Sequence, residues 1–131
     1  MAQVSEAERV AAAQAYIDAL ASHDGDAVPF APDCTRIEVG IKTGFSGNHL
    51  RRTLSRGPQF RIIAATTAPE FSVYGDEIRA RFDVLTKPSL AGWHVWAHID
   101  ETFVIPAHDQ NGSARIHHIK ARIRPFVKRA R

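Results

Sequence analysis

The sequence predicts an α+β fold, with a few helices packed on one face of a mainly antiparallel sheet. The first 57 residues contain two segments in which apolar residues recur at helical spacing, with a short strand-like stretch between them. From residue 60 onward the chain instead contains runs rich in β-branched and aromatic residues, each bounded by turn-forming residues. Helices that are segregated in sequence from a run of adjacent strands are typical of the α+β class.

The first element is expected to be a helix of about 17 residues. It opens with Ser5-Glu6-Ala7-Glu8, which matches a capping box, and apolar residues then recur at helical spacing from Val10 to Leu20. The segment stops at His23-Asp24-Gly25-Asp26. A short second helix is expected over residues 26–30, where nearby prolines leave little room for a longer one.

A strand over residues 34–39 and a glycine-containing loop are expected next, followed by a third helix. Ser46 can cap this helix, which extends to about residue 55 and ends at Gly57-Pro58. Five strands are expected after this helix, over residues 60–67, 70–74, 77–85, 93–105 and 114–126. A tight turn joins the second of them to the third.

Length and composition indicate one ordinary globular domain. A chain of 131 residues can bury about two thirds of its unfolded surface, which is enough for a core and a pocket. We expect a single domain over residues 1–126 and a basic tail over residues 127–131. No stretch approaches about 18 apolar residues, and the N-terminus lacks the pattern of a secretory signal, so we expect a cytoplasmic protein. The single Cys34 excludes an internal disulfide.

The positive charge is concentrated at the end of the chain. The formal net charge is +3, but residues 120–131 carry six Lys and Arg residues and no acid, so the rest of the chain has a net charge of −3. A short cationic end is usually solvated, and this distribution argues against a nucleic-acid interface. We expect neither nucleic acid nor a membrane as a partner.

Three polar residues lie in otherwise apolar segments: Tyr16 in the first helix, Glu38 in the short strand and Asp100 in a late strand. A phenol or a carboxyl on a hydrophobic element costs free energy unless it is paired or used in function. These three residues are therefore the candidate site. His94 and His98, four residues apart on one strand, would lie about 13 Å from each other, too far to share a metal ion, and we expect no metal and no cofactor.

The order of these elements resembles the cone-shaped fold of the nuclear-transport-factor-2-like (NTF2-like) and SnoaL-like proteins. Residues 15–26 and 30–34 resemble the opening helix of that superfamily and the turn into its first strand. Residues 98–103 and 115–119 resemble its final hairpin. The superfamily contains isomerases, hydrolases, dehydratases, cyclases and proteins that are not enzymes, so the fold alone does not decide the function.

Within that superfamily, the sequence is most similar to the Δ5-3-ketosteroid isomerases. Tyr16 falls on their oxyanion-hole tyrosine, Glu38 on their general-base aspartate and Asp100 on their oxyanion-hole aspartic acid, and Ser46-Gly47 matches the start of their third helix. The resemblance implies a cofactor-free isomerase that moves a C=C bond in a small apolar carbonyl compound. Glu38 would remove a proton next to the carbonyl, and Tyr16 and a protonated Asp100 would stabilise the enolate oxygen.

The match has departures. The base is Glu in place of Asp, and a polar Arg36 and His98 precede Glu38 and Asp100 by two residues on the same strand faces. Asp100 also shares its strand face with polar residues, while Val95, Ala97, Ile99 and Phe103 form the more apolar face. If the apolar face packs against the helices, Asp100 points outward.

Two other kinds of function stay open. Arg81-Phe82-Asp83 resembles the Arg-x-Asp strand of limonene-1,2-epoxide hydrolases, although the pair would also suit an exposed ion pair. His117 lies on the apolar face of the last strand, either as a core histidine or as an acid/base, as in the superfamily's dehydratases. The remaining alternative is a non-catalytic module that binds a small apolar molecule or mediates dimerisation. Because members of this fold often dimerise through the outer sheet face, we expect a homodimer.

Overall fold

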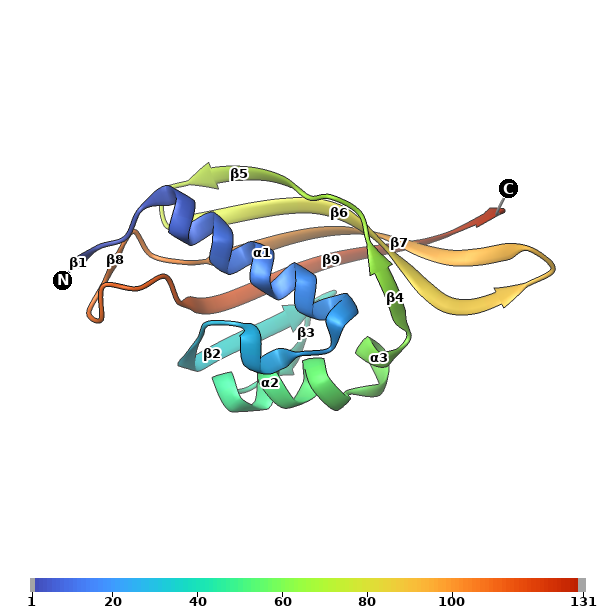
Figure 1. The fold of residues 1–131 in the computed structure, drawn as a ribbon, viewed down its shortest axis with the longest axis horizontal. Helices are drawn as coiled ribbons and strands as arrows, with labels where there is room; N and C mark the ends of the chain where they lie inside the picture. Colours follow the sequence, from blue (N-terminus) through green and yellow to red (C-terminus); the bar gives the residue numbers. More distant parts are fainter. Residues whose placement is uncertain (1, 130–131) are drawn as a thin grey trace.

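The computed structural model describes residues 2–129 and confirms the α+β fold (Figure 1). Helices α1 (Glu6–Ser22), α2 (Gly47–Arg56) and α3 (Pro58–Arg61) and the 3-10 helix η1 (Gly25–Ala27) cover one face of a seven-stranded sheet. Its strands are β2 (Phe30–Glu38), β3 (Ile41–Gly44), β4 (Ile63–Thr66), β5 (Glu70–Tyr74), β6 (Glu77–Leu90), β7 (Trp93–Val104) and β9 (Ile116–Arg129). A separate two-stranded ribbon pairs β1 (Ala2–Gln3) with β8 (His108–Asp109).

Local capping sets the helix boundaries. The Ser5 side chain accepts a hydrogen bond from the backbone N–H of Glu8 at 3.1 Å, and α1 ends at His23, whose backbone is left-handed. Ser46 caps α2 in the same way. The helix expected over residues 26–30 is wrong, because only the 3-10 turn Gly25–Ala27 forms before β2 begins. No helix within residues 2–129 combines the length and hydropathy needed to cross a membrane.

The sheet has the strand order β3-β2-β9-β7-β6-β4, with β5 also paired to β6. All pairs are antiparallel except β2 with β9. The loop expected after Val39 contains strand β3, which was not predicted. Strand β9 extends through Arg129, so residues 127–129, expected in a basic tail, are paired with β7, while residues 130 and 131 lie outside the described residues.

Alternation along β7 decides which side chains face the helices. Ala97, Ile99, Glu101 and Phe103 are buried, whereas His98 and the other residues between them lie on the outer face. The core between the helices and the sheet contains Ala13, Ile17 and Leu20 of α1, Leu50 and Leu54 of α2, and Ile78, Phe103 and Ile119 of the sheet. Each fully buried Leu, Ile or Phe contributes about 1.5–3 kcal/mol to stability.

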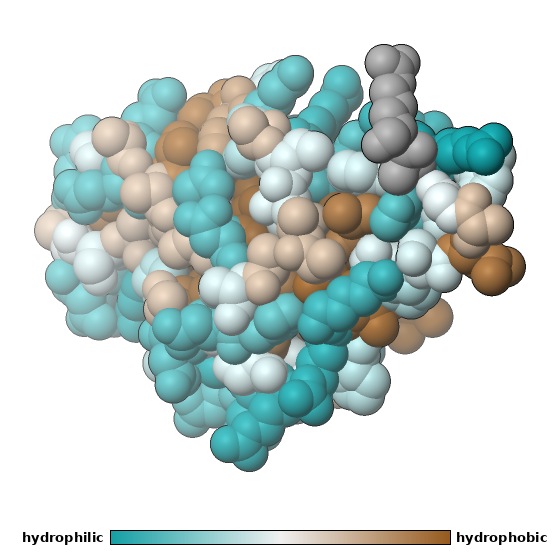
Figure 2. Space-filling model, turned by 45° about the vertical axis from the view of Figure 1, so that its right-hand side comes forward, coloured by the Kyte–Doolittle hydropathy of each residue, from teal (hydrophilic) through white to brown (hydrophobic). Residues whose placement is uncertain are grey.

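The β6–β7 hairpin extends beyond the helix layer, and the end of β9 accompanies it (Figure 1). Its two-residue turn has positive φ at Ala91 (53°) and Gly92 (82°), as hairpins of this length require. With the hairpin end turned forward, Figure 2 shows hydrophobic surface beside hydrophilic surface in this part of the molecule. The helices therefore cover only part of the long strands, and a cavity lies where this cover ends.

Candidate functional site

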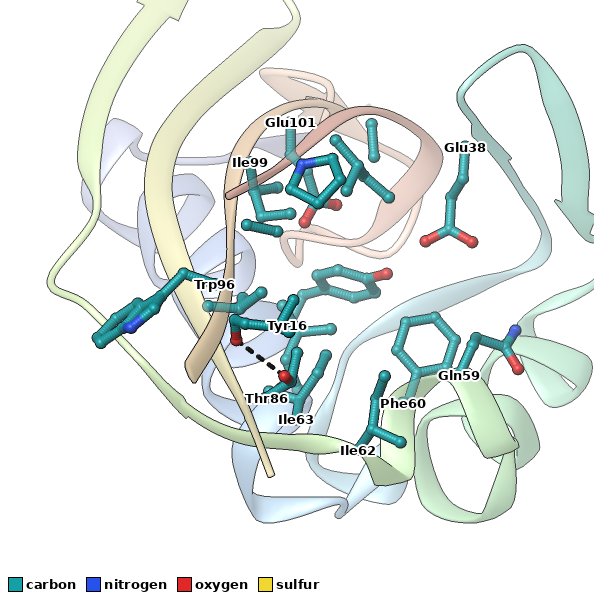
Figure 3. Close-up of a pocket in the computed structure, with 17 residues that line it drawn as sticks. Tyr16, Glu38, Gln59, Phe60, Ile62, Ile63, Thr86, Trp96, Ile99 and Glu101 are labelled. Carbon is teal, nitrogen blue, oxygen red and sulfur yellow. Dashed lines mark hydrogen bonds between the residues drawn. The ribbon is translucent and has the colours of Figure 1, made fainter. Parts of the chain in front are cut away.

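A cavity of about 310 Å³ lies between α1, the α3–β4 segment and the helix-facing side of the sheet (Figure 3). Most of its wall is apolar, formed by Leu20, Phe60, Ile62, Ile63, Val84, Val95, Trp96, Ala97, Ile99, Ala121, Ile123 and Pro125. The polar side chains on the wall are Tyr16, Glu38, Gln59, Thr86 and Glu101. The Thr86 hydroxyl already donates to the Val95 carbonyl at 2.8 Å, so three ionisable groups and Gln59 remain for a ligand.

Tyr16 projects from α1 into the cavity and is almost fully buried. Phe30 and Phe103 contact its ring edge to face, with centroid distances of 6.1 and 5.4 Å, which fixes the ring. The hydroxyl oxygen accepts a hydrogen bond from Nη1 of Arg36 at 3.3 Å. Since a guanidinium only donates, the phenolic proton is left for another acceptor, and Figure 3 shows the hydroxyl directed toward the side of the cavity that holds Glu38. Burial raises the pKa of Tyr16 well above its ordinary value, so the phenol is protonated at neutral pH.

Arg36 organises this wall from behind. Its fully buried guanidinium donates to Oγ1 and the carbonyl of Thr43 and to Oγ1 of Thr53, at 3.0 to 3.1 Å, and lies 4.6 Å from the centre of the Phe60 ring. Its Nε is also 3.7 Å from Oε1 of Glu38. These contacts pair a charge that would otherwise be costly to bury. The sequence marked Arg36 only as a departure from the family pattern, but the residue holds both Tyr16 and Glu38 in place.

Glu101 is the residue that sequence reasoning missed. It lies on the buried face of β7, lines the cavity, and its Oε2 is buried without a hydrogen-bond partner among the described residues. Burial, together with the nearby Glu38 carboxylate and against the opposing effect of Arg36, raises the pKa of Glu101 to about 8. At neutral pH this carboxyl is therefore mostly neutral and can donate a proton to a ligand. The alternation of buried Ala97, Ile99 and Phe103 was the signal that could have identified it.

The predicted residues separate into two groups. Tyr16 and Glu38 both line the cavity (Figure 3). Asp100 lies on the opposite face of β7, where its Oδ2 is 3.8 Å from Nε of Arg81, so its assignment to the cavity is corrected. The pairing of β7 with β9 runs without a register shift past Asp100, so no bulge turns this side chain inward. The next residue along the strand, Glu101, occupies the position in the cavity that was expected for Asp100.

The alternative residues also lie away from the cavity. The Arg81 side chain is 80% exposed, and Oδ1 of Asp83 lies 2.7 Å from Nδ1 of His98 on the outer sheet face. This geometry is that of exposed pairs. His117 does not line the cavity, and its Nε2 is 3.5 Å from Oδ2 of the buried Asp109. Within the described part of the chain, no three His, Cys, Asp or Glu side chains cluster as metal ligands do.

The arrangement suits acid–base chemistry on an apolar ligand. It offers two neutral O–H donors, Tyr16 and Glu101, and a carboxylate, Glu38, which is paired with Arg36 and reaches the cavity from a separate strand. Two carboxyl groups in different environments can divide the roles of acid and base. The apolar wall excludes water and so strengthens hydrogen bonds to a developing charge.

Several solved structures share the fold of this chain. The chain is similar to a ketosteroid isomerase-like protein from Erwinia carotovora atroseptica, with 20% identity, a TM-score of 0.64, and 89% of this chain and 94% of that chain covered. It is similar to an LEH-like epoxide hydrolase of M. tuberculosis, with 16% identity, a TM-score of 0.67, and 90% and 84% covered. An NTF-2 like protein of unknown function from Burkholderia xenovorans gives 16% identity, a TM-score of 0.62, and 96% and 87% covered.

At such low identity these neighbours show the fold alone, which is the NTF2-like fold that the sequence resembles. No curated protein matches the sequence. A family model, however, matches residues 2–123, nearly the whole length of the chain. The chain therefore belongs to the family described as a domain of unknown function, DUF8021.

Proposed function

We propose that the protein is a cofactor-independent isomerase that moves a C=C bond in a small apolar carbonyl compound. The observation that carries the proposal is that Tyr16, Glu38 and a raised-pKa Glu101 line one apolar cavity. A carbonyl oxygen placed between Tyr16 and Glu101 would accept two O–H hydrogen bonds. The neighbouring carbon would then face the remaining carboxylate, Glu38.

The reaction would proceed in two proton transfers. Glu38 takes a proton from the carbon next to the carbonyl, and the electron pair of that C–H bond forms an enolate. Hydrogen bonds from Tyr16 and Glu101 stabilise the negative oxygen, which is where charge develops in the transition state. Glu38 then returns the proton to the far carbon of the former double bond, which leaves a conjugated enone. Atoms and electrons balance without a further reactant.

Three matched variants test the roles with a panel of β,γ-unsaturated ketones that includes a Δ5-3-ketosteroid. Formation of the conjugated product is followed by its ultraviolet absorbance. Glu38→Gln is expected to abolish turnover and keep ligand binding. Glu101→Leu is expected to lose about 10²–10³-fold in kcat, the effect of removing one oxyanion donor, while Glu101→Gln keeps part of the activity. Asp100→Asn on the outer face is the control and should retain wild-type turnover. Full turnover by Glu38→Gln would refute the proposal.

A second candidate is a module that binds an apolar ligand without converting it. The contact of 3.7 Å between Nε of Arg36 and Oε1 of Glu38 favours it, because it occupies one side of the carboxylate that would act as the base. This candidate predicts that the ketones bind to the wild type and to Glu38→Gln with equal affinity and that neither protein produces a conjugated enone.

A further inference from the structure

The far end of the β6–β7 hairpin exposes apolar side chains from three strands. Leu90 is 82% exposed, Val127 62%, Trp93 47% and Val95 39%. With Pro88, Ser89 and Ala91, these residues line a shallow apolar hollow, which we call the hairpin-end surface. Adjacent large apolar residues at such exposures are typical of a surface that contacts an apolar partner.

The hairpin-end surface continues into the cavity. Val95 lines both the hollow and the cavity. Trp96, which follows it in β7, and Pro125, which pairs with Ala97, also line the cavity. Ile62, on the cavity wall, is itself 45% exposed. An apolar compound could therefore pass from whatever covers the hairpin-end surface into the cavity without crossing a charged barrier.

The charges around this surface are all positive. Residues 39–69, 84–99 and 110–131 contain no Asp or Glu. Lys87 precedes the lining residue Pro88 on β6, and Lys128 and Arg129 follow the lining residue Val127 on β9. The Lys128 ammonium lies 5.5 Å from the Trp96 ring, and the Arg129 guanidinium lies 6.0 Å from the Trp93 ring. The nearest acidic residues on these strands, Asp83 of β6 and Asp100 of β7, pair with His98 and Arg81 on the outer sheet face, and Glu38 faces the cavity. The net charge of the whole chain hides this asymmetry.

The exposed apolar side chains and the neighbouring positive charges together indicate what kind of partner covers the hairpin-end surface. A second copy joined about a two-fold axis would bring this cationic end against the same cationic end, which is repulsive. A purely polar polyanion would leave the apolar side chains in water. An anionic lipid surface satisfies both features, because apolar side chains and tryptophan enter the interface while Lys and Arg contact the headgroups.

We propose that the hairpin-end surface docks on an anionic lipid bilayer, with the cavity opening toward the lipid, so that the ligand is a lipophilic compound taken from the membrane. This departs from the expectation drawn from the sequence, which considered only segments long enough to span a membrane. The docking depends on the surface alone and not on the proposed reaction. With few inserting side chains, the binding is weak and reversible.

The test is co-sedimentation with phosphatidylcholine vesicles that contain or lack phosphatidylglycerol. We expect binding to the mixed vesicles, a decrease as salt is raised, and little binding to phosphatidylcholine alone. Both tryptophans of the chain, Trp93 and Trp96, lie at this end, so their emission should shift to the blue on binding.

Paired variants separate the two contributions. Leu90→Asp and Val127→Asp are expected to lower partitioning by about tenfold or more, from the loss of a buried apolar side chain, and Lys128→Glu by about fivefold or more. Tyr74→Asp is the control, because Tyr74 is 59% exposed but lies at the opposite end of the sheet. Each changed side chain is exposed, so unchanged thermal unfolding shows that the variants fold.

Three results would overturn the proposal: no binding to either kind of vesicle, an equal loss in Tyr74→Asp, or a dimer that Leu90→Asp converts to a monomer without any vesicle binding. Turnover of a water-soluble ketone without vesicles distinguishes this proposal from the proposed function. Leu90→Asp should leave that turnover unchanged, whereas Glu38→Gln should abolish it and leave vesicle binding unchanged.

Discussion

Replacing Glu101 by Gln should change how the stability of the protein depends on pH. Burial raises the pKa of Glu101 from 4.5 to about 8, so between these pH values the folded protein holds a proton that the unfolded chain has lost. The contribution of Glu101 to the free energy of unfolding is then fully present below about pH 4.5 and is lost as the pH rises through 8. Gln has nearly the same shape and cannot ionise, so this contribution disappears in the variant.

The magnitude follows from the size of the pKa shift. Each pH unit between the two values removes at most about 1.4 kcal/mol, so the full decrease is on the order of 4–5 kcal/mol and is mostly complete at pH 8. Glu101→Gln should therefore differ little from the wild type near pH 5. Near pH 8.5 it should be more stable by several kcal/mol.

Urea unfolding followed by tryptophan fluorescence at several pH values measures this difference directly. Asp100→Asn is the matched control, because it removes a carboxyl one residue away that is only half-buried on the outer face. Its pH dependence should follow that of the wild type. If the wild type and Glu101→Gln lose stability in parallel between pH 5 and 8, Glu101 is not a buried neutral acid, and its role as a donor fails with it.

Three further variants test Tyr16 and Arg36 at the site and Asp83 on the outer sheet face. Tyr16→Phe should lower kcat by about 10²–10³-fold in an assay with the active ketone, since it removes one oxyanion donor, and should retain ligand binding. Arg36→Leu should lower the free energy of unfolding in urea by about 3–5 kcal/mol, because it leaves buried partners unsatisfied; a loss under about 1 kcal/mol would contradict the network described for Arg36. Asp83→Asn should leave turnover within about twofold and stability within about 1 kcal/mol, because its partner is the exposed His98, and a large loss of turnover would favour the hydrolase alternative.

Elements with local signals could be predicted from the sequence. Helix α1 begins after the Ser5 cap and ends at His23, and β5 spans Glu70–Tyr74 as expected, because caps, turns and period are encoded nearby in the chain. Strand β3 was missed because it has four residues, one of them glycine, and it exists only through pairing with β2.

Only part of the candidate site could be predicted, because local sequence patterns identify polar residues but do not give the direction of their side chains. Tyr16 and Glu38 could be found as polar residues on apolar elements, and both line the cavity. Choosing between Asp100 and Glu101 required the direction of each side chain, and the family motif and the strand alternation pointed to different residues. The closeness of Glu38 to Glu101 depends on β9 lying between β2 and β7, which no local pattern encodes.

That position of β9 also bears on how the chain folds. The parallel pairing joins Thr35 to His118, 83 residues later, through a side-chain hydrogen bond of 2.7 Å. The strand that carries Arg36 and Glu38 can enter the sheet only after the last strand is in place, and such long-range pairing slows folding. During synthesis, the wall that holds the proposed base would therefore form only after the residues of β9, Ile116–Arg129, have been made.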